Sequence, residues 1–265
     1  MTAREVLLVP SGDDLVGVEV CGAGPAVVLL HGSGGNRATW FQQVPALADD
    51  HTVVVVEARG AGRSTDREAQ SGPVAGVLDL EAVRVHLGLE TWSLAGHSLG
   101  AWTALRYAVT HPERVSSVVC LSSLAGVFPP VAADFWERFT ADLAQQGWPA
   151  QELGRPLSLT AGFCDTRPDL AYLYQLVNAL NPPLAPTVPA AQIRTHDLGA
   201  EELARLAMPV AFVTGSEDVI APPDVVAACA AHCGASFEVL SGAGHLALWE
   251  NPALVTAVLR AQLSR

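Results

Sequence analysis

The stretch AGHSLGA, residues 95–101, places one serine, Ser98, between two glycines that each lie two positions away. An apolar run at 92–95 precedes it, and a helical pattern at 99–110 follows it. A serine on a sharp turn between a strand and a helix has a strained backbone, and the chain packs too tightly there for neighbouring side chains. The turn lifts the hydroxyl clear of the sheet, beside the free N–H groups of the helix N-terminus. The pattern therefore predicts that Ser98 is a nucleophile.

Short apolar runs recur on both sides of this turn and alternate with helical patterns. Such runs suit the central strands of a parallel sheet that is covered on both faces. The alternation implies right-handed crossovers and a doubly wound sheet, so we expect an α/β fold with a mostly parallel sheet and flanking helices. The expected strands are 15–20, 26–30, 52–57, 92–95, 115–122, 210–214 and 236–240, and the expected helices are 73–87, 99–110, 223–232 and 252–263.

One segment interrupts this alternation. Residues 125–206 separate two strands that a single crossover could join, and they contain helical stretches and proline-rich joints. An insertion of this length with helices of its own is typical of a cap or lid. We therefore expect residues 1–124 and 207–265 to form the α/β core and residues 125–206 to form an inserted helical lid.

Composition restricts the possible partners and the compartment. The formal net charge of −12 disfavours nucleic acid and anionic membranes as partners. The fifteen basic residues are all arginine, which excludes Schiff-base lysine chemistry, and the five scattered cysteines indicate a reducing compartment. The N-terminus lacks a signal-peptide pattern, and no apolar run approaches the roughly 20 residues of a membrane span. We expect a cytoplasmic protein that is a monomer or a homodimer.

Cys229 and Cys233, with His232 between them, raise the question of a metal site. These residues lie in an alanine-rich helical stretch, VVAACAAHC, in which cysteines more often pack than bind metal. We therefore expect no metal, and the serine chemistry described below requires no organic cofactor.

A serine hydroxyl is a weak nucleophile that needs a base, and the base needs an acid to orient it. Among the eight histidines, His245 lies in the loop between the last expected strand and the last expected helix. That loop belongs to the carboxyl edge of the sheet, where the nucleophile also emerges. His51, His86 and His232 have the pattern of surface or helix-face residues, and His196 falls in the inserted segment. We therefore expect His245 to be the base.

The acid should come from another loop at the same edge. The stretch VTGSEDVIAPPD follows the strand 210–214 and contains Glu217 and Asp218. Asp218 lies in the turn before the next helix and is favoured, with Glu217 and Asp224 as alternatives. The loop SLAGVF, after the strand 115–122, contains no carboxylate.

The order Ser98, Asp218, His245, together with HGSGG at 31–35, resembles the α/β-hydrolase fold superfamily. HGSGGN, ARGAGRS, GHSLGA, TGSEDVIAPP and GAGHLALWENP all fall in the order and spacing of that family. The resemblance covers the chain outside the inserted segment. One departure is Glu57, which stands where many relatives have aspartate at a structural position.

The resemblance also implies an oxyanion hole and a reaction. In the family, the residue after His-Gly and the residue after the nucleophile donate backbone N–H groups to the oxyanion, which implies Ser33 and Leu99 here. The small residues of GSGG let the backbone approach a ligand, and fixed N–H dipoles stabilise a developing negative charge. Relatives that dehalogenate or open epoxides use aspartate as the nucleophile, so Ser98 argues against both reactions.

The implied reaction is acyl transfer through an acyl-enzyme on Ser98. We favour hydrolysis of a carboxylic ester or lactone of a small to medium apolar compound. Three alternatives remain: a hydrolase of carbon–carbon bonds in β-diketone-like substrates, a biosynthetic lyase or cyclase, and a hydrolase-like protein that binds a small molecule. Aromatic and small residues near the catalytic loops and in the insertion are candidates for the substrate pocket: Gly32, Trp40, Trp102, Phe135, Trp136, Tyr172 and Trp249.

Overall fold

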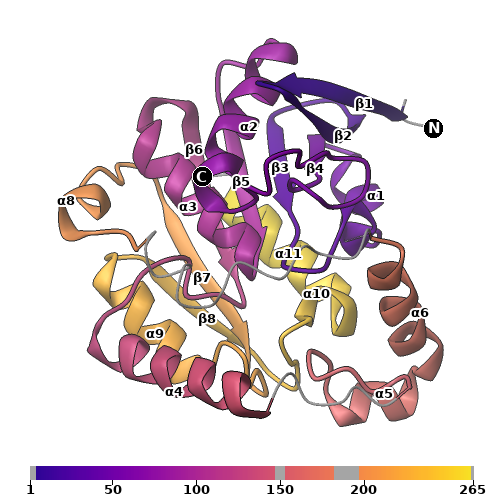
Figure 1. The fold of residues 1–265 in the computed structure, drawn as a ribbon, viewed down its shortest axis with the longest axis vertical. Helices are drawn as coiled ribbons and strands as arrows, with labels where there is room; N and C mark the ends of the chain where they lie inside the picture. The colour runs from indigo at the N-terminus through magenta and orange to yellow at the C-terminus, as the bar shows by residue number, and fades with distance from the viewer. Residues whose placement is uncertain (1–3, 147–152, 182–196, 264–265) are drawn as a thin grey trace.

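The computed structural model describes residues 4–146, 153–181 and 197–263, which form a single eight-stranded sheet between two layers of helices (Figure 1). The strands lie in the order β1-β2-β4-β3-β5-β6-β7-β8. β2 runs antiparallel to β1 and β4, and the other neighbouring strands are parallel. Their bounds are β1 Arg4–Ser11, β2 Asp14–Gly22, β3 Ala26–Leu30, β4 Thr52–Val56, β5 Trp92–His97, β6 Val115–Leu121, β7 Val210–Gly215 and β8 Ser236–Leu240.

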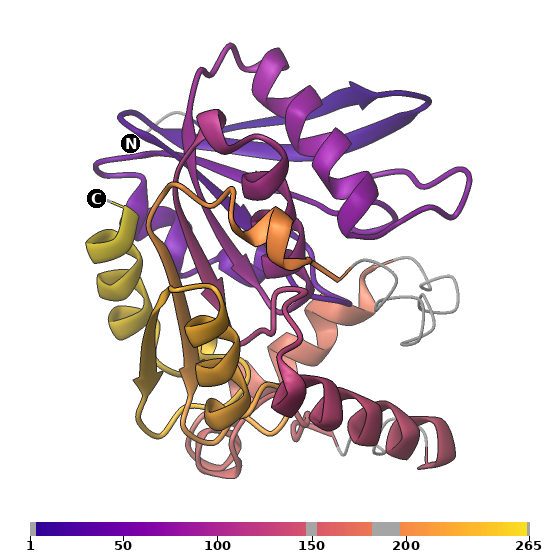
Figure 2. The same cartoon turned by 90° about the vertical axis from the view of Figure 1, so that its left-hand side faces the viewer.

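Helices cover both faces of the sheet. α2, α3 and α9 pack on one face, and α1 and α11 pack on the other, so that α2 and α11 lie on opposite sides in Figure 2. The bounds of the helices outside the inserted segment are α1 Gln43–Leu47, α2 Pro73–His86, α3 Leu99–Thr110, α9 Pro223–His232, α10 Ala247–Glu250 and α11 Pro252–Leu263, with short 3-10 helices at Arg37–Trp40 and Pro112–Arg114.

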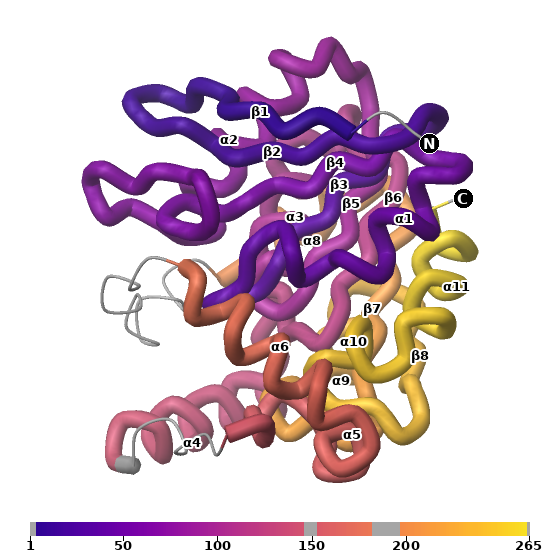
Figure 3. Tube along the Cα trace, turned by 90° about the vertical axis from the view of Figure 1, so that its right-hand side faces the viewer, coloured from indigo at the N-terminus to yellow at the C-terminus, as the bar shows by residue number. Residues whose placement is uncertain are grey.

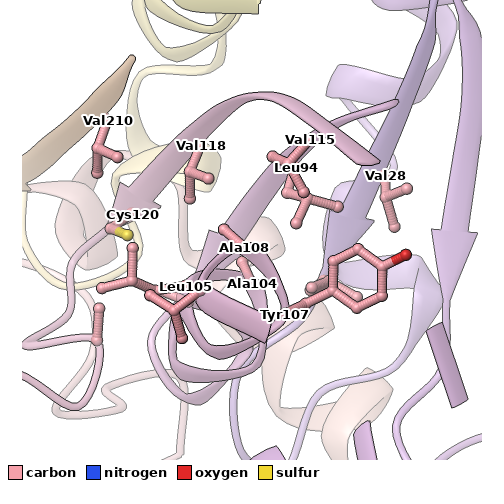
Figure 4. Packing of buried hydrophobic residues seen from close by; sticks show 14 of the residues in the cluster. Val28, Leu94, Ala104, Leu105, Tyr107, Ala108, Val115, Val118, Cys120 and Val210 are labelled. Atoms are coloured by element: carbon pink, nitrogen blue, oxygen red, sulfur yellow. The ribbon is translucent and has the colours of Figure 1, made fainter. Parts of the chain in front are cut away.

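The two layers explain why the central strands are mostly apolar. In β3, Val28 and Leu30 join the hydrophobic cluster under α2 and α3, whereas Val27 and Leu29 join the cluster under α1 and α11. Successive side chains of a strand point to opposite faces, so a strand covered on both faces forms a nearly continuous apolar run. Figure 4 shows the first cluster, in which side chains of neighbouring strands lie against Leu105 of α3.

The expected fold class, an α/β fold with a mostly parallel sheet and flanking helices, is confirmed. The strands 26–30 and 236–240 and the helices 99–110, 223–232 and 252–263 have the expected bounds, and the other expected elements differ by one or two residues at an end. β1 was missed. It is a half-exposed edge strand whose apolar run at 6–9 is followed directly by Pro10, a residue that within sheets is confined to edge strands, strand starts and bulges. The short helices α1, α5, α8 and α10 were missed as well.

The inserted segment lies between β6 and β7 and straddles the carboxyl edge of the sheet. It contains α4 Pro130–Gln146, α5 Ala161–Thr166, α6 Pro168–Ala179 and α8 Ala200–Leu203. α4 packs against α9 on one side, while Cys164 and Ala171 of α5 and α6 join the cluster on the other side. Figure 3 shows α4, α5 and α6 together at one end of the molecule. The action of residues 125–206 as a lid stays a prediction.

One histidine differs from its expected environment. His51 is buried, with 6% of its surface exposed, and its Nδ1 lies 2.9 Å from Asp50 Oδ1, so it is not a surface residue. His86 and His232 are exposed as expected, whereas His196 lies outside the described residues. In the part of the chain that the structure describes, no helix is long and apolar enough to cross a membrane.

Candidate active site

Ser98 lies on the turn between β5 and α3 with φ 51° and ψ −119°, a conformation that a residue with a side chain rarely adopts. A Cβ on Gly96 would lie 2.4 Å from the backbone of Ala101, and one on Gly100 would lie 2.4 Å from the carbonyl oxygen of Leu30. Glycine is therefore required at both positions, because neighbouring backbone atoms leave no room for a Cβ atom. The Ser98 carbonyl is fixed as well, since it accepts a hydrogen bond from the Ala101 N–H at 3.0 Å.

His245 and Asp218 form a hydrogen-bonded pair at the same edge of the sheet. His245 Nδ1 lies 3.1 and 3.0 Å from the two carboxylate oxygens of Asp218. The side chains are 7% and 0% exposed. Asp218 Oδ1 also accepts hydrogen bonds from the backbone N–H groups of Ile220 and Ala221, at 2.9 and 2.8 Å. His245 Nδ1 is thereby committed to the carboxylate, so Nε2 is the ring nitrogen that Asp218 does not occupy.

The surroundings of Asp218 keep its carboxylate ionised. Burial opposes ionisation, but the charge and hydrogen bond of His245 and the N–H groups of Ala221 and Ile220 outweigh it, so the pKa of Asp218 lies below its usual value. The alternative acids, Glu217 and Asp224, are exposed. Among the three candidates, the structure brings only Asp218 to His245.

His97 connects the turn that carries Ser98 to the loop that carries His245. Its Nε2 lies 2.9 Å from the carbonyl oxygen of His245, and the two rings are 5.0 Å apart at their centroids. Because a carbonyl only accepts, Nε2 must carry the proton. Burial and the nearby His245 lower the pKa of His97 to about 3, so the ring is neutral. From the sequence, His97 could be assigned to the turn, but not to this contact.

The HGSGG loop lies directly beside Ser98. A Cβ on Gly32 would lie 3.0 Å from Ser98 Cβ. The Gly32 carbonyl accepts hydrogen bonds from Gly35 N–H at 3.1 Å and from His31 Nδ1 at 2.8 Å. In a trans peptide the N–H points away from the C=O, so these bonds also fix the direction of the Ser33 N–H.

The N–H groups of Ser33 and Leu99 remain available to a ligand. Leu99 is the first residue of α3, where a backbone N–H has no partner within the helix. Among the described residues, no acceptor takes up the N–H of Ser33 or of Leu99. Free N–H groups at these positions match the expected oxyanion hole, although their role stays a prediction.

The candidate pocket residues lie in three different environments. Gly32 borders Ser98, as described above. Trp40 and Trp249 are 0% and 1% exposed, and Trp249 Nε1 donates to the carbonyl oxygen of Thr39 at 2.9 Å, so both indoles belong to the packed core. Tyr172 is 44% exposed on α6. The structure therefore does not bring all the candidates to one surface.

The remaining candidates form an aromatic cluster on α3 and α4. Trp102 lies 5.5 Å from Phe128 and 5.8 Å from Trp136, measured between ring centroids. Phe135 stacks on Phe139 at 5.6 Å. Trp102 is one helical turn beyond Ser98 in α3, so this cluster begins one turn from that residue.

The cysteines offer no support for a metal site. Burial raises the pKa of Cys229 and of Cys233 to about 12, which disfavours the thiolate that a metal ion needs. Within residues 4–146, 153–181 and 197–263, no group of three or more histidine, cysteine, aspartate or glutamate side chains is placed to hold a metal ion.

Solved structures share the fold of this chain. An enol-lactonase from Burkholderia xenovorans LB400 matches with a TM-score of 0.81 at 20% identity, over 98% of this chain and 100% of that chain. A thermophilic esterase from Thermogutta terrifontis matches with a TM-score of 0.79 at 24% identity, over 98% and 97% of the two chains. Likeness at this level of identity establishes the fold.

Curated relatives are similar in sequence. An uncharacterized protein of Mycobacterium tuberculosis is 27% identical over 256 residues, covering 88% of this chain and 74% of the relative. The pimeloyl-[acyl-carrier protein] methyl ester esterase of Aeromonas hydrophila is 36% identical over 145 residues, or 49% of this chain and 54% of that enzyme. A fluoroacetate dehalogenase of a Burkholderia species is 37% identical over 120 residues, or 43% and 39%.

The family model described as alpha/beta hydrolase fold matches residues 25–252, which include the nucleophile turn, the inserted segment and the His245 loop. Because this match spans most of the chain, the protein belongs to the alpha/beta hydrolase fold family, which is a family of hydrolases.

Proposed function

We propose that this protein is a serine hydrolase that cleaves a carboxylic ester or lactone of a small to medium apolar compound. The observation that carries the proposal is the His245–Asp218 pair, joined to the Ser98 turn by the hydrogen bond from His97 Nε2 to the carbonyl oxygen of His245. A strained serine, an oriented histidine and a buried carboxylate together form the machinery of nucleophilic acyl transfer.

In the proposed reaction, Ser98 Oγ attacks the substrate carbonyl while His245 Nε2 takes the serine proton. Asp218 holds Nδ1–H and stabilises the imidazolium that forms. The N–H groups of Ser33 and Leu99 donate to the developing oxyanion. His245 then returns the proton to the leaving alcohol, and water releases the acyl group from Ser98 by the same route. This scheme requires no metal or organic cofactor.

The names of similar proteins support an ester or a lactone as substrate. An esterase and an enol-lactonase share the fold, and a methyl ester esterase is 36% identical over about half of the chain. The aromatic cluster around Trp102 supports an apolar acyl or alcohol group near the nucleophile. The similarity to a dehalogenase does not favour dehalogenation here, because Ser98 occupies the nucleophile position.

A substrate panel tests this proposal. Purified protein and the Ser98→Ala variant would be assayed with esters, lactones, thioesters and vinylogous diketones of matched size. We expect the wild type to turn over esters or lactones fastest and the variant to lose this activity. Faster cleavage of the diketones would indicate a carbon–carbon bond hydrolase, and binding without turnover of any compound would indicate a binding protein. Either result would overturn the proposal.

A further inference from the structure

Asn181, two residues beyond the end of α6, reaches from the inserted segment to the HGSGG loop. Its Nδ2 donates to the carbonyl oxygens of Gly34 and Gly35, at 2.5 and 3.1 Å. Its Oδ1 accepts from the Gly62 N–H at 3.2 Å and from Asn36 Nδ2 at 3.1 Å. A primary amide has two N–H donors and two acceptor positions, so this side chain is fully used.

Asn36 completes the contact from the side of the loop. Its Oδ1 accepts from the Ala38 N–H at 2.9 Å, and its Nδ2 also donates to the carbonyl oxygen of Val177 in α6, at 3.1 Å. The pair Asn36–Asn181 therefore joins the last turn of α6 to the loop that contains Ser33. Only the carboxamide of an asparagine or glutamine donates and accepts in this way, and a carboxylate cannot replace it.

The bonds from Asn181 act on the part of the loop that is otherwise least restrained. Gly34 has φ +73°, a conformation that glycine adopts freely, and a Cβ at this position would meet nothing within 4 Å. His31 fixes the Gly32 carbonyl before Ser33, whereas Asn181 fixes the Gly34 and Gly35 carbonyls after it. The Gly34 carbonyl and the Gly35 N–H belong to one planar peptide, and this N–H donates to the Gly32 carbonyl, which shares a peptide with the Ser33 N–H. The bond from Asn181 therefore orients a donor that fixes the Ser33 peptide, and this restraint comes from the insertion.

We propose that Asn181 is a positioning residue that holds the Ser33 N–H in the direction needed to stabilise the oxyanion. This inference rests on the proposed function, because it assigns Asn181 to the same acyl-transfer site. Asn181 acts through the backbone of the loop rather than on the substrate. Its loss should therefore weaken transition-state stabilisation more than substrate binding, and the inserted segment becomes part of the catalytic machinery.

The test compares Asn181→Ala and Asn181→Asp with the wild type, using the ester that the wild type cleaves best. We expect each variant to lower kcat by roughly 10- to 100-fold, as misplacement of an oxyanion donor does, and to leave KM within about threefold. Affinity for a trifluoromethyl ketone, which forms a tetrahedral oxyanion on the serine, should fall by the same factor as kcat/KM.

Asn181→Asp separates hydrogen-bond donation from shape. Aspartate has nearly the size of asparagine but would place a carboxylate oxygen against the Gly34 and Gly35 carbonyls, so we expect it to be at least as impaired as alanine. Asn36→Asp keeps the bond to the Ala38 N–H and loses only the donated bonds, so it should show a smaller loss of kcat. Asn251→Ala, which removes a bond to the Leu254 N–H at the start of α11, is the matched control and should retain the wild-type kcat.

A wild-type kcat in Asn181→Asp would overturn the inference, and so would a rise in KM as large as the fall in kcat. Either result would leave the proposed function intact. If Asn181→Ala does not fold, Asn36→Asp decides the matter, since an unchanged ketone affinity in that variant contradicts the inference. A wild type that neither cleaves esters nor binds the ketone would remove the proposed function and the inference together.

Discussion

The nucleophile turn and the inserted segment are held in place by different kinds of contact. At the turn, the backbone around Gly96 and Gly100 approaches its neighbours so closely that no Cβ fits. The inserted segment instead reaches the loops around Ser98 and His245 through single hydrogen bonds, one of which is a backbone bond from the Leu246 N–H to the Ser158 carbonyl oxygen at 2.9 Å. Asn181 binds the HGSGG loop, and the carboxylate of Glu250 accepts hydrogen bonds from the backbone N–H groups of Thr160 in the insertion and Gly244 beside His245.

This difference indicates how each region tolerates change. Where the backbone packs this closely, no side chain can be accommodated by a small shift. A substitution of either glycine at the turn should therefore disrupt the turn completely. Side-chain hydrogen bonds can be removed one at a time, so substitutions that remove them in the insertion should lower activity or stability in steps. We therefore expect the core to set whether the chemistry occurs and the insertion to adjust how well the loops are aligned.

The largest effect on catalysis should come from the core. Asp218→Asn should lower kcat by about 10⁴-fold, because an amide favours the wrong tautomer of His245 and does not stabilise the imidazolium. Steady-state kinetics with the preferred ester measures this, and Asp224→Asn, an exposed carboxylate at the start of α9, serves as the control. A nearly normal kcat in Asp218→Asn would move the acid elsewhere.

The next effect concerns stability and contrasts one glycine from each region. Gly100→Ala places a Cβ 2.4 Å from the Leu30 carbonyl oxygen and should lower the free energy of unfolding by about 3 kcal/mol or more. Gly162→Ala, in α5 of the insertion, meets nothing within 4 Å and should raise the free energy of unfolding by about 0.5–1 kcal/mol. Urea unfolding compares the two. Equal effects would contradict the distinction between the regions.

A graded effect is expected at Glu250, which joins the insertion to the His245 loop. Glu250→Ala leaves the N–H groups of Thr160 and Gly244 without their acceptor and should cost about 1–3 kcal/mol of stability. Thermal and urea unfolding would measure the loss against Glu90→Ala, an exposed carboxylate after α2. If both variants unfold like the wild type, the Glu250 contact does not hold the insertion.

An effect that is small near neutral pH and grows as the pH falls should arise from His97. Its pKa falls from 6.5 to about 3 on folding, so between these values the unfolded chain binds a proton that the native protein does not. Stability should therefore fall as the pH falls below 6.5, with a slope of roughly 1.4 kcal/mol per pH unit from this residue. Urea unfolding from pH 4 to 8 measures it. His97→Gln should reduce this slope by roughly 1.4 kcal/mol per pH unit, which corresponds to one proton. An unchanged slope would contradict a buried, neutral His97.

The core could be predicted from the sequence because its signals are local. The strand before Ser98, the helix after it and the two glycines lie within one short stretch, and the apolar runs of the buried strands reflect their two covered faces. β1 escaped prediction because its apolar run at 6–9 is followed directly by Pro10, which weakens the pattern of a strand. His51 escaped because nothing local to it indicates that packing buries it.

The contacts that align the site could not be predicted in this way. Asn36 and Asn181 are 145 positions apart, and His97 and the carbonyl of His245 are 148 apart, so only the folded chain brings them together. Asn36 stands directly after HGSGG, which singles it out as a loop residue, but no sequence signal identifies Asn181 as its partner. Long-range polar pairs leave no periodic trace in a sequence.

The central claim, that Ser98 is the nucleophile, is tested most directly by labelling with a fluorophosphonate probe, followed by intact mass measurement. We expect one adduct per chain in the wild type, none in Ser98→Ala, and slower labelling in Asp218→Asn. A wild type that stays unlabelled, or a Ser98→Ala variant that labels as well as the wild type, would contradict it.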